Sequence, residues 1–445
     1  MTDTIAAVAT PPGEGGIGIV RLSGPGAEEI LLRLFCPAGK PGRLESHRLY
    51  YGHVKDGAAT VDEGMAVVMR APRSYTREDV AELQLHGGQA VLQTALRLCL
   101  REGARLAEPG EFTRRAFENG RIDLAQAEAV MALISSRSEQ ARQAAVRQLE
   151  GGASAFIREA ADELYRIQAA VAACIDYPEE VSEEEALADV QPRLAALSQH
   201  LEEAADEKAA RILQNGLQVA LCGRPNVGKS SLLNALLRED RAIVTPVAGT
   251  TRDIVTGETT LGGCLVRLTD TAGVRDTEDT VERLGVERAK KAMREADLLL
   301  LVLDASQRLT EEDRLLLQEC AGQDAVILLN KGDLPQTVFA EDVSGYGPRV
   351  MNISASRPET LAPLRALLAE KARCADSLAL TQPRHVEAAR RAAAHLRSAA
   401  EAMNTAVDLC SVDLLAAQSA LAEITGDAVE ERLLDRVFEE FCVGK

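Results

Sequence analysis

The stretch Gly223-Arg224-Pro225-Asn226-Val227-Gly228-Lys229-Ser230 constrains what this chain can fold into more than any other part of its sequence. An apolar run at 217–222 precedes it, and a helical pattern at 231–237 follows it. A glycine-rich loop between a strand and a helix is a P-loop, whose backbone N–H groups surround phosphate oxygens at the positive end of the helix. The sequence therefore predicts a phosphate-binding loop in a doubly wound α/β domain.

The residue types in and after this loop predict a metal ion beside the phosphates. We expect Lys229 to reach the β- and γ-phosphates and the hydroxyl of Ser230 to bind Mg²⁺. Asp270 ends a second predicted strand, where its carboxylate can reach Mg²⁺ through a water molecule. Thr251, in the segment between these two strands, is the other expected Mg²⁺ contact.

Two later motifs predict that the bound base is guanine. Asn330-Lys331-Gly332-Asp333 ends an apolar run, and the Asp333 carboxylate can accept hydrogen bonds from both N1–H and the exocyclic amine of guanine, a donor pair that adenine lacks. Ser354-Ala355 follows a short predicted strand and would offer a backbone N–H to guanine O6. The residues expected to bind GTP are Asn226, Val227, Gly228, Lys229, Ser230, Ser231, Thr245, Thr250, Thr251, Asp270, Thr271, Ala272, Gly273, Asn330, Lys331, Asp333, Ser354 and Ala355.

The catalytic parts of this predicted site differ from those of a Ras-like switch. Val274 stands where a water-orienting Gln would follow Asp270-Thr271-Ala272-Gly273, and no Arg in this motif is placed as an arginine finger. The amide oxygen of Asn226 could instead hold a monovalent cation against the phosphates, with further oxygens from residues 245–253. The segment 276–283 holds several carboxylates, and its pattern does not single out one of them as the general base.

Charge and composition limit how the chain can meet a nucleic acid or a membrane. The net charge is −18, and residues 121–215 and 376–445 together carry 14 of these negative charges, so any RNA contact must be local or made by a partner. No apolar run approaches the roughly 18–20 residues of a membrane span, and no signal-peptide pattern opens the chain. The nine cysteines are odd in number and lack paired spacing, which favours reduced thiols and a cytoplasmic location.

The first 120 residues predict an α+β domain. Gly13-Glu14-Gly15-Gly16-Ile17-Gly18 fits the dinucleotide-binding pattern, but a strand rather than a helix follows it, so we interpret it as a loop. The expected strands are 4–9, 17–22, 48–54, 65–69 and 80–85, and the expected helices are 27–35 and 90–102.

Alanine-rich helical patterns lie on both sides of the P-loop domain. They predict helices at 126–148, 156–174, 187–213, 385–403, 412–424 and 428–441, with the acidic run 179–185 as a solvated connection. The economical interpretation is one helical domain interrupted by the P-loop domain, and two separate helical domains are the alternative.

A chain of 445 residues is too long for a single core. We therefore predict a multidomain chain, with an α+β N-terminal domain, an all-α helical domain and an inserted α/β P-loop GTPase domain. The expected boundaries are 1–120 for the N-terminal domain, 121–213 and 377–445 for the two parts of the helical domain, and 214–376 for the GTPase domain.

Short motifs outside the P-loop domain identify a family. They are Ala9-Thr10-Pro11-Pro12-Gly13, Gly16-Ile17-Gly18-Ile19-Val20-Arg21-Leu22-Ser23-Gly24, Glu82-Leu83-Gln84-Leu85-His86-Gly87-Gly88, Pro109-Gly110-Glu111-Phe112-Thr113, Asp123-Leu124-Ala125-Gln126-Ala127-Glu128-Ala129 and the tail Phe441-Cys442-Val443-Gly444-Lys445. Together with the nucleotide motifs, they make the chain resemble the MnmE (TrmE) family of tRNA modification GTPases from end to end.

The resemblance implies a folate ligand for the N-terminal domain. It implies that this domain dimerises and binds 5-formyl- or methylene-tetrahydrofolate as a one-carbon donor, with contacts from Arg21, Glu78, Arg121 and Lys445. Arg121 lies where the family also uses Lys. Cys442 is implied in the modification chemistry, and near Lys445 and a folate its thiolate would be favoured.

In the nucleotide site, the resemblance implies that K⁺ replaces the arginine finger. Asn226, Thr245, Val247 and Thr250 match the family's K⁺ ligands, and Glu282 matches its catalytic acid. The two GTPase domains of a homodimer would meet across this ion.

The activity that the resemblance implies is addition of an aminomethyl or carboxymethylaminomethyl group to C5 of the wobble uridine of certain tRNAs, together with the FAD-dependent partner MnmG. The alternative is a regulatory GTPase switch in ribosome assembly, a class that shares Asn226, Val274 and K⁺ activation. Such a switch would be expected to carry a basic RNA-binding appendage, whereas the helical segments here are acidic. Folate binding would separate the two.

Overall fold

The structure is a computed structural model that describes residues 3–39, 43–177, 179–180, 182–238, 255–270, 293–347, 349–375, 379–405, 407–428, 431–439, 441 and 443–444. The chain forms two compact units. Unit 1 comprises residues 1–131, 148–172 and 411–445, and unit 2 comprises residues 132–147 and 173–410.

Unit 1 is built on a seven-stranded sheet in the order β3-β4-β5-β6-β2-β1-β7, in which only β1 and β7 pair in parallel. The strands are β1 (Ile5–Val8), β2 (Gly18–Ser23), β3 (Phe35–Pro37), β4 (Tyr50–Asp56), β5 (Ala59–Met69), β6 (Val80–Leu85) and β7 (Arg105–Leu106). The helices wholly or partly in unit 1 are α1 (Ala27–Leu34), α2 (Gln89–Arg101), α3 (Glu111–Glu118), α4 (Leu124–Ser135), α6 (Gly152–Asp176), α15 (Cys410–Thr425) and α16 (Glu431–Glu439).

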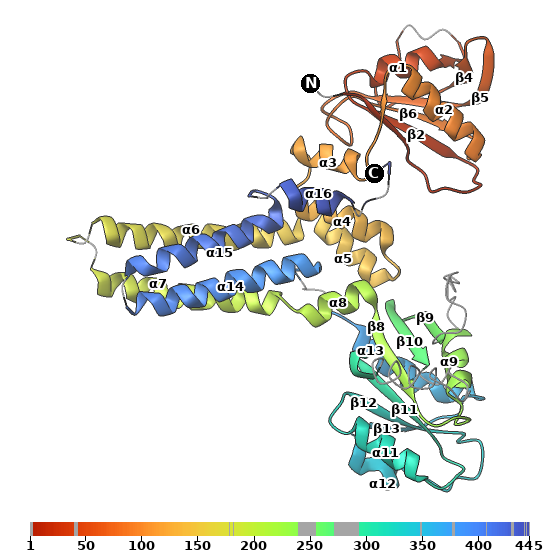
Figure 1. Cartoon of the computed structure of the whole chain (residues 1–445), viewed down its shortest axis with the longest axis vertical. Coiled ribbons are helices and arrows are strands. Elements are labelled where there is room, and N and C mark those ends of the chain that lie inside the picture. Colours follow the sequence, from red (N-terminus) through yellow and green to blue (C-terminus); the bar gives the residue numbers. More distant parts are fainter. Residues whose placement is uncertain are drawn as a thin grey trace, which may run out of the picture. The chain divides into compact units, whose positions relative to one another are not determined.

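The core of this sheet forms where its apolar face meets α1 and α2 (Figure 1). Leu22 and Leu83 from neighbouring strands are fully buried together with Leu31 of α1. Buried and half-buried residues alternate over the first four positions of β2, as in a sheet with one covered face.

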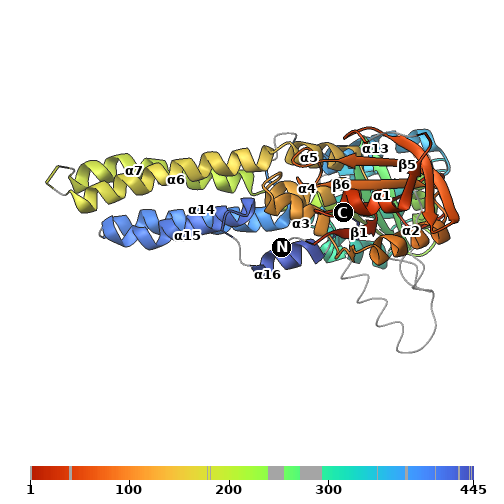
Figure 2. The ribbon, with the colours of Figure 1, turned by 90° about the horizontal axis from the view of Figure 1, so that it is seen from above.

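The C-terminal helix α16 packs against α3 (Figure 2). Arg114 of α3 forms an ion pair with Asp435 of α16 at 2.8 Å, and Phe438 is buried beside Ala116. Residues more than 300 positions apart in the sequence therefore share one small core in unit 1.

Unit 2 holds a six-stranded sheet in the order β13-β12-β11-β8-β10-β9, parallel except for the edge strand β9. The strands are β8 (Leu217–Cys222), β9 (Val255–Leu261), β10 (Cys264–Asp270), β11 (Leu298–Asp304), β12 (Ala325–Asn330) and β13 (Arg349–Asn352). The helices are α5 (Glu139–Leu149, partly in unit 1), α7 (Glu183–Ala204), α8 (Glu207–Asn215), α9 (Lys229–Arg238), α11 (Glu311–Cys320), α12 (Ala340–Val343), α13 (Ala362–Ala372) and α14 (Pro383–Met403), with short 3₁₀ turns at Ser344–Tyr346, Pro358–Leu361 and Val407–Leu409.

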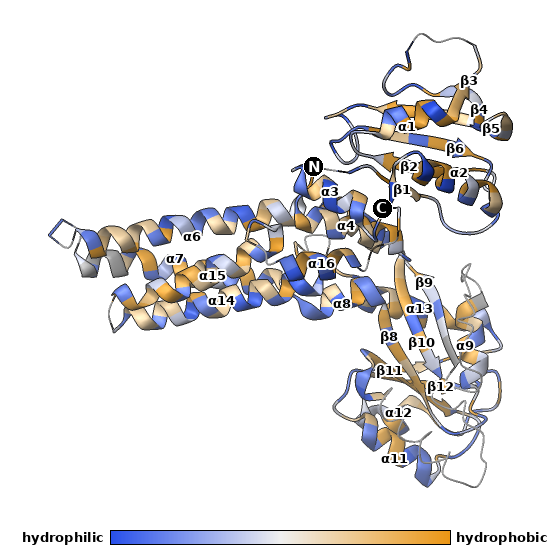
Figure 3. Ribbon diagram, turned by 45° about the horizontal axis from the view of Figure 1, so that its top comes forward, coloured by the Kyte–Doolittle hydropathy of each residue, from blue (hydrophilic) through white to orange (hydrophobic). Residues whose placement is uncertain are grey.

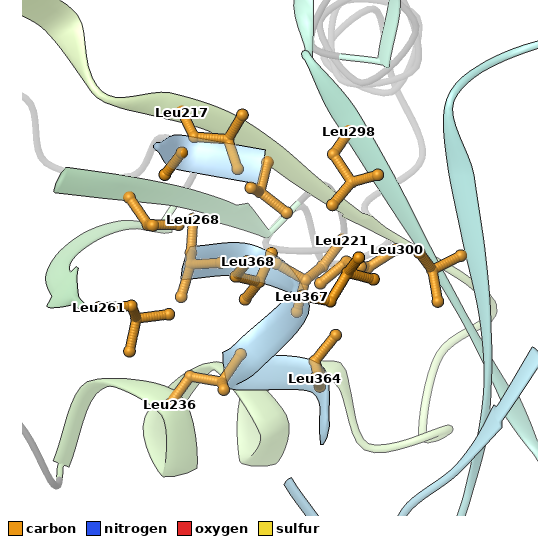
Figure 4. Close-up of a cluster of buried hydrophobic side chains, with 14 of the residues drawn as sticks. Leu217, Leu221, Leu236, Leu261, Leu268, Leu298, Leu300, Leu364, Leu367 and Leu368 are labelled. Carbon is orange, nitrogen blue, oxygen red and sulfur yellow. The ribbon is translucent and has the colours of Figure 1, made fainter. Parts of the chain in front are cut away.

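The central strands of this sheet are apolar along almost their whole length, as the orange colour of β8, β11 and β12 shows (Figure 3). Every residue of β11 is buried. A parallel strand covered on both faces needs such a continuous apolar run. On one face, leucines of the sheet pack against Leu364, Leu367 and Leu368 of α13 (Figure 4).

Helices α7 and α14 pack side by side in antiparallel directions (Figure 1). The hydroxyl of Ser198 donates to the carbonyl of Ala393 at 3.1 Å, and Gln191 donates to Asn404 at 2.7 Å. The buried face of α14 carries mainly alanine, which lets the two backbones approach closely.

The segments that lead into and out of the α/β sheet of unit 2 are bonded to each other. The thiol of Cys374, just after α13, donates to the carbonyl of Ala209 in α8 at 3.3 Å. Farther along the same helix, Arg211 pairs with the buried carboxylate of Asp297, which also accepts the N–H of Gln218 at 2.9 Å. The start and end of this α/β segment are thus fixed side by side.

The multidomain fold class predicted from the sequence is confirmed, with two α+β or α/β sheets and long helices. The helices predicted at 126–148 and at 187–213 are each wrong as single helices. Ser138 accepts the N–H of Ala141 and starts α5, and Asp206 accepts the N–H of Ala209 and starts α8. A side-chain cap of this kind satisfies the first backbone donors of a new helix and favours a break before it.

Smaller differences concern three further elements. The acidic run expected as a connection is partly helical, because α7 begins at Glu183. Strand β5 begins at Ala59 rather than at residue 65, and helix α3 was not predicted.

Among the described residues, no helix is both long enough and apolar enough to cross a bilayer.

Leu300 tests the core of unit 2. Its side chain is fully buried in β11, so Leu300→Ala should lower the free energy of unfolding of this unit by about 2–5 kcal/mol. Amide hydrogen exchange of peptides from β11 and β12 would measure the loss. Leu315→Ala is the matched control, because Leu315 is 55% exposed on α11 and its loss should cost less than about 0.5 kcal/mol. Equal effects of the two changes would contradict this assignment of the core.

Candidate functional site

The predicted phosphate loop lies at the carboxyl end of β8, between β10 and β11. The chain passes to one side of β8 through β9 and β10 and to the other through β11, so this end of β8 is the switch point where open α/β sheets bind ligands. Gly223 has φ 138°, and a Cβ there would lie 2.3 Å from the carbonyl oxygen of Val302. Only glycine lets the loop leave the strand so close to β11.

Asn226 occupies the turn of this loop in the left-handed region, with φ 65°. Asn adopts this region more readily than most residues, which accounts for its presence at a position that would otherwise favour glycine. The side chain is exposed, whereas the next residue, Val227, is buried against the sheet. The loop is therefore anchored at Val227 and presents Asn226 outward.

Lys229 is held inside the loop at the start of α9. Its ammonium group donates to the carbonyls of Gly223 at 2.6 Å and of Arg224 at 2.7 Å. Burial lowers the pKa of Lys229, and the charge of Asp270 opposes this shift. A buried ammonium group surrounded by backbone dipoles is suited to pair with an anion.

Ser230 and Asp270, which the sequence assigned to Mg²⁺ from different motifs, are brought together. The Ser230 hydroxyl donates to the Asp270 carboxylate at 2.9 Å, and Asp270 is buried at the end of β10. Hydroxyl and carboxylate oxygens are ligands that Mg²⁺ accepts, and the ion usually takes only one or two protein carboxylates beside phosphates. These residues fit a nucleotide-bound Mg²⁺.

Asn330 bonds to both halves of the site rather than standing open to a ligand. Its amide N–H donates to the carbonyl of Val227 at 2.7 Å, and its amide oxygen accepts the N–H of Ala355 at 3.0 Å. The residue is 1% exposed. It therefore fixes the phosphate loop and the segment at 354–355 to the end of β12.

Asp333 is exposed and carries the carboxylate predicted to read guanine. The hydroxyl of Ser354 donates to it at 2.5 Å, and this hydrogen bond is the main cause that lowers the pKa of Asp333 below its ordinary value. A carboxylate has about four acceptor positions, so it can still accept two further N–H groups. The N–H of Ser354 itself donates to Thr360 at 2.9 Å, and the contact of segment 354–355 with guanine O6 stays a prediction.

Two ion pairs in this region were not found from the sequence. Lys331 pairs with Asp304 at 2.6 Å, and Arg224 pairs with the buried Asp313 at 2.7 Å. Burial alone would raise the pKa of Asp304, but hydrogen bonds from Lys331 and Ser306 outweigh it and lower the pKa. The pair of Lys331 with Asp304 could have been predicted, because Asp304 ends the apolar strand β11 beside the strand that leads to Lys331.

Part of the predicted site lies outside the described residues. In the nucleotide region these are Thr245, Val247, Thr250, Thr251, Thr271, Ala272, Gly273 and Glu282, and in the C-terminal tail they are Cys442 and Lys445. Their assigned roles stay predictions. Ser231, which is described, is exposed in the first turn of α9.

A second cluster lies in unit 1 around Tyr75. The guanidinium carbons of Arg21 and Arg121 lie 5.7 Å and 4.7 Å from the centre of its ring, and Arg21 also pairs with Glu82 at 2.8 Å. The Tyr75 hydroxyl is within 2.9 Å of the Thr113 hydroxyl. Two residues assigned to folate by resemblance thus meet on one aromatic ring that the sequence did not single out.

Glu78, the third such residue, is held by two partners. Ser23 of β2 donates to it at 2.7 Å, and Arg115 of α3 pairs with it at 3.1 Å. Arg115 is buried and also pairs with Asp3 at 2.7 Å and Glu111 at 3.0 Å. The orientation of the Glu78 carboxylate therefore depends on a buried arginine.

The described residues of the C-terminal tail contact the N-terminal part of unit 1. Val443 forms a β-bridge with Pro109, and Phe441 is buried in the core beside α16. A Cβ on Gly444 would lie 2.3 Å from the carbonyl oxygen of Val8, the residue after the strand partner of Arg21. These described tail residues are therefore anchored in unit 1.

Comparison with known proteins gives the same family at every level. The family model described as the GTP-binding protein TrmE N-terminus matches residues 4–121, and the model of the MnmE helical domain matches residues 124–442. The protein named tRNA modification GTPase MnmE from Listeria welshimeri is 44% identical over 465 residues, which covers 100% of this chain and 99% of its own length. The protein of the same name from Lactococcus lactis subsp. lactis is 46% identical over 455 residues, which covers 100% of this chain and 98% of that protein.

Asp333→Asn tests the guanine assignment. The amide keeps one acceptor but loses the charge and the second acceptor for guanine, so affinity for GTP should fall at least about tenfold, the size of one charged hydrogen bond. Affinity for xanthosine triphosphate should rise, because its C2 carbonyl can accept from the new amide. Titration with fluorescent analogues of both nucleotides would measure this. Glu341→Gln, at an exposed position outside the site, is the control, and an unchanged GTP preference in Asp333→Asn would overturn the assignment.

Proposed function

This chain belongs to the MnmE family of tRNA modification GTPases, and on that premise we propose that it hydrolyses GTP to drive the modification of tRNA at C5 of the wobble uridine. The product would be an aminomethyl or carboxymethylaminomethyl group. The one-carbon unit would come from 5-formyl- or methylene-tetrahydrofolate, and the FAD-dependent partner MnmG would act with it. The reaction would take place in the cytoplasm.

The observation that carries this proposal is that three motifs meet at the carboxyl ends of the parallel strands of unit 2. Lys229 is buried in the phosphate loop, Ser230 and Asp270 lie 2.9 Å apart, and Asp333 is exposed and ionised beside Ser354. Asn330 ties these loops together through two buried hydrogen bonds. A nucleotide would be held by the loop N–H groups and Lys229 at its phosphates and by Asp333 at its base.

For hydrolysis we propose that Ser230 and Thr251 hold Mg²⁺ and that Asn226, Thr245, Val247 and Thr250 hold K⁺. The exposed amide of Asn226 fits the oxygen chemistry of such a cation, and the loop geometry that presents it is fixed by the buried Val227. When bound, these cations supply positive charge to the phosphates, in place of an arginine finger. Glu282 would orient the attacking water.

For the folate we propose a site around Tyr75. Arg21 and Arg121 on its ring offer cationic groups to anionic or aromatic parts of a ligand. The Glu78 carboxylate, oriented by Ser23 and Arg115, could accept paired N–H groups of a pterin. Lys445 and the thiol of Cys442 would approach from the tail, since Gly444 lies against the backbone of Val8.

We further propose the assembly and division of the chain that the family resemblance implies. The N-terminal domains, residues 1–120, would form a homodimer, and the GTPase domain, 214–376, would interrupt a helical domain formed by 121–213 and 377–445. MnmG and tRNA would bind the homodimer.

A regulatory GTPase switch in ribosome assembly is the second candidate. The nucleotide site by itself suits both functions, because either would use Lys229, Ser230 and Asp333 in the same way. The stacking of Arg21 and Arg121 on Tyr75, together with the fixed carboxylate of Glu78, favours the first, since a pure switch has no use for a folate. Titration with tetrahydrofolate separates them.

Replacing K⁺ by Na⁺ should slow GTP hydrolysis strongly. Na⁺ is too small for the proposed set of oxygens, so little of the positive charge would reach the phosphates. Steady-state phosphate release in equal concentrations of KCl and NaCl measures the effect. Asn226→Ala should be slow in both salts and should respond little to K⁺. Equal rates of the wild-type chain in the two salts would remove the cation proposal.

Mass spectrometry of tRNA nucleosides tests the function as a whole. Cells lacking this chain should lose the modified wobble uridine. The wild-type chain should restore it, and Cys442→Ser should not. Cys36→Ser is the matched control, because Cys36 is an exposed thiol in β3. An unchanged nucleoside profile in the deletion strain would favour the regulatory switch. Full restoration by Cys442→Ser would contradict the proposed role of the tail thiol.

A further inference from the structure

A hollow in unit 1 includes Tyr75 and Arg121 from the proposed folate site and extends beyond them. It has a volume of 490 Å³ and is lined by the β5–β6 loop together with His47 and Arg121. Its lining residues include Arg73, Arg77, Arg121 and Tyr75. Volumes of about 300–1,000 Å³ are typical of sites for small ligands.

The backbone around this hollow is held in an uncommon conformation. Four non-glycine residues of the described chain have left-handed φ angles: His47, Arg77, Asn226 and Lys331. Asn226 and Lys331 belong to the nucleotide loops, and His47 and Arg77 line the hollow. Such residues cluster at ligand sites, where the surrounding structure imposes them.

The β5–β6 loop, residues 70–79, is fixed by its own hydrogen bonds. Asn119 donates to the carbonyl of Thr76 at 2.7 Å, and Arg77 donates back to the carbonyl of Asn119 at 3.0 Å. The hydroxyl of Ser74 donates to the carbonyl of Glu78 at 2.6 Å. The hollow is therefore preorganised and would lose little entropy on binding.

The charge on its walls is uncompensated. Among the described residues, no carboxylate lies within ion-pair distance of Arg73, Arg77 or Arg121. The acids of the same loop are engaged elsewhere, because Glu78 pairs with Arg115 and Asp79 accepts the N–H of Ala71 at 2.8 Å. Three arginines without a carboxylate partner among the described residues thus line one open hollow, on a chain whose net charge is −18.

We propose that this hollow binds the γ-linked polyglutamate tail of the folate. The inference rests on the folate site proposed above, with which the hollow shares Tyr75 and Arg121. Each added glutamate brings one α-carboxylate, and guanidinium groups bind carboxylates through paired hydrogen bonds. The hollow is open to solvent, so a tail of several residues can extend beyond it, and Arg73 and Arg77 are the lining arginines outside the proposed folate contacts.

An RNA backbone is the other polyanion that three arginines could bind. The observations favour the folate tail, since the cationic groups line a concavity of small-ligand size that borders Arg121 and Tyr75. RNA binding is therefore an outcome of the test.

The experiment compares 5-formyltetrahydrofolate with one and with five glutamates, by calorimetric titration of the full-length chain. The wild-type chain should bind the pentaglutamate roughly tenfold more tightly, the size expected of two or three exposed charge pairs. The preference should shrink with added salt. In Arg73→Ala/Arg77→Asn the ratio of the two affinities should fall to about one. Asn is chosen at position 77 because it tolerates the left-handed backbone.

Arg97→Ala is the matched control, because Arg97 is an exposed arginine on α2 of the same unit that does not line the hollow. It should keep the tenfold ratio. Equal affinities of the wild-type chain for the two folates would overturn the tail site and leave the folate proposal intact. Failure of both folates to bind would overturn the folate proposal and this inference with it. A loss of tRNA affinity in the double variant without a change in the folate ratio would assign the hollow to RNA and overturn the inference.

Discussion

The nucleotide loops of unit 2 depend on one buried amide. Asn330 donates to the phosphate loop at Val227 and accepts from Ala355, so three loops from distant parts of the sequence are fixed by a single side chain. Both groups would otherwise be buried without a partner, at about 1–3 kcal/mol each. The phosphate and base ends of the site are therefore fixed to each other, with Lys229 in the phosphate loop and Asp333 in the segment that follows Asn330.

The parts of this arrangement that follow a local rule could be predicted from the sequence. The spacing of the P-loop between a strand and a helix specifies its local geometry, so the positions of Lys229 and Ser230 followed from the motif. The breaks at Ser138 and Asp206 were also readable as helix caps, but long alanine-rich patterns masked them. The pairs of Arg224 with Asp313 and of Tyr75 with Arg121 join residues far apart, and no local pattern specifies them.

The net charge of the whole chain and the charge around a single site also lead to different expectations. The net charge of −18 indicated that any contact with a polyanion must be local, and two guanidinium groups do gather on the ring of Tyr75. Composition averages over the surface, whereas recognition depends on the field within a few ångströms. Arg115 illustrates the cost of such a region, since it is buried and needs Glu78, Glu111 and Asp3 as partners.

The bond between Cys374 and Ala209 bears on how such a chain could arise. The start and end of the long α/β segment lie within hydrogen-bond distance, so its two ends could be joined by a very short linker. Segments with adjacent ends are tolerated as insertions, because neither core is cut when they are gained or lost. The α/β segment therefore has the geometry of an inserted segment, since its entry and its exit meet at one point of unit 2.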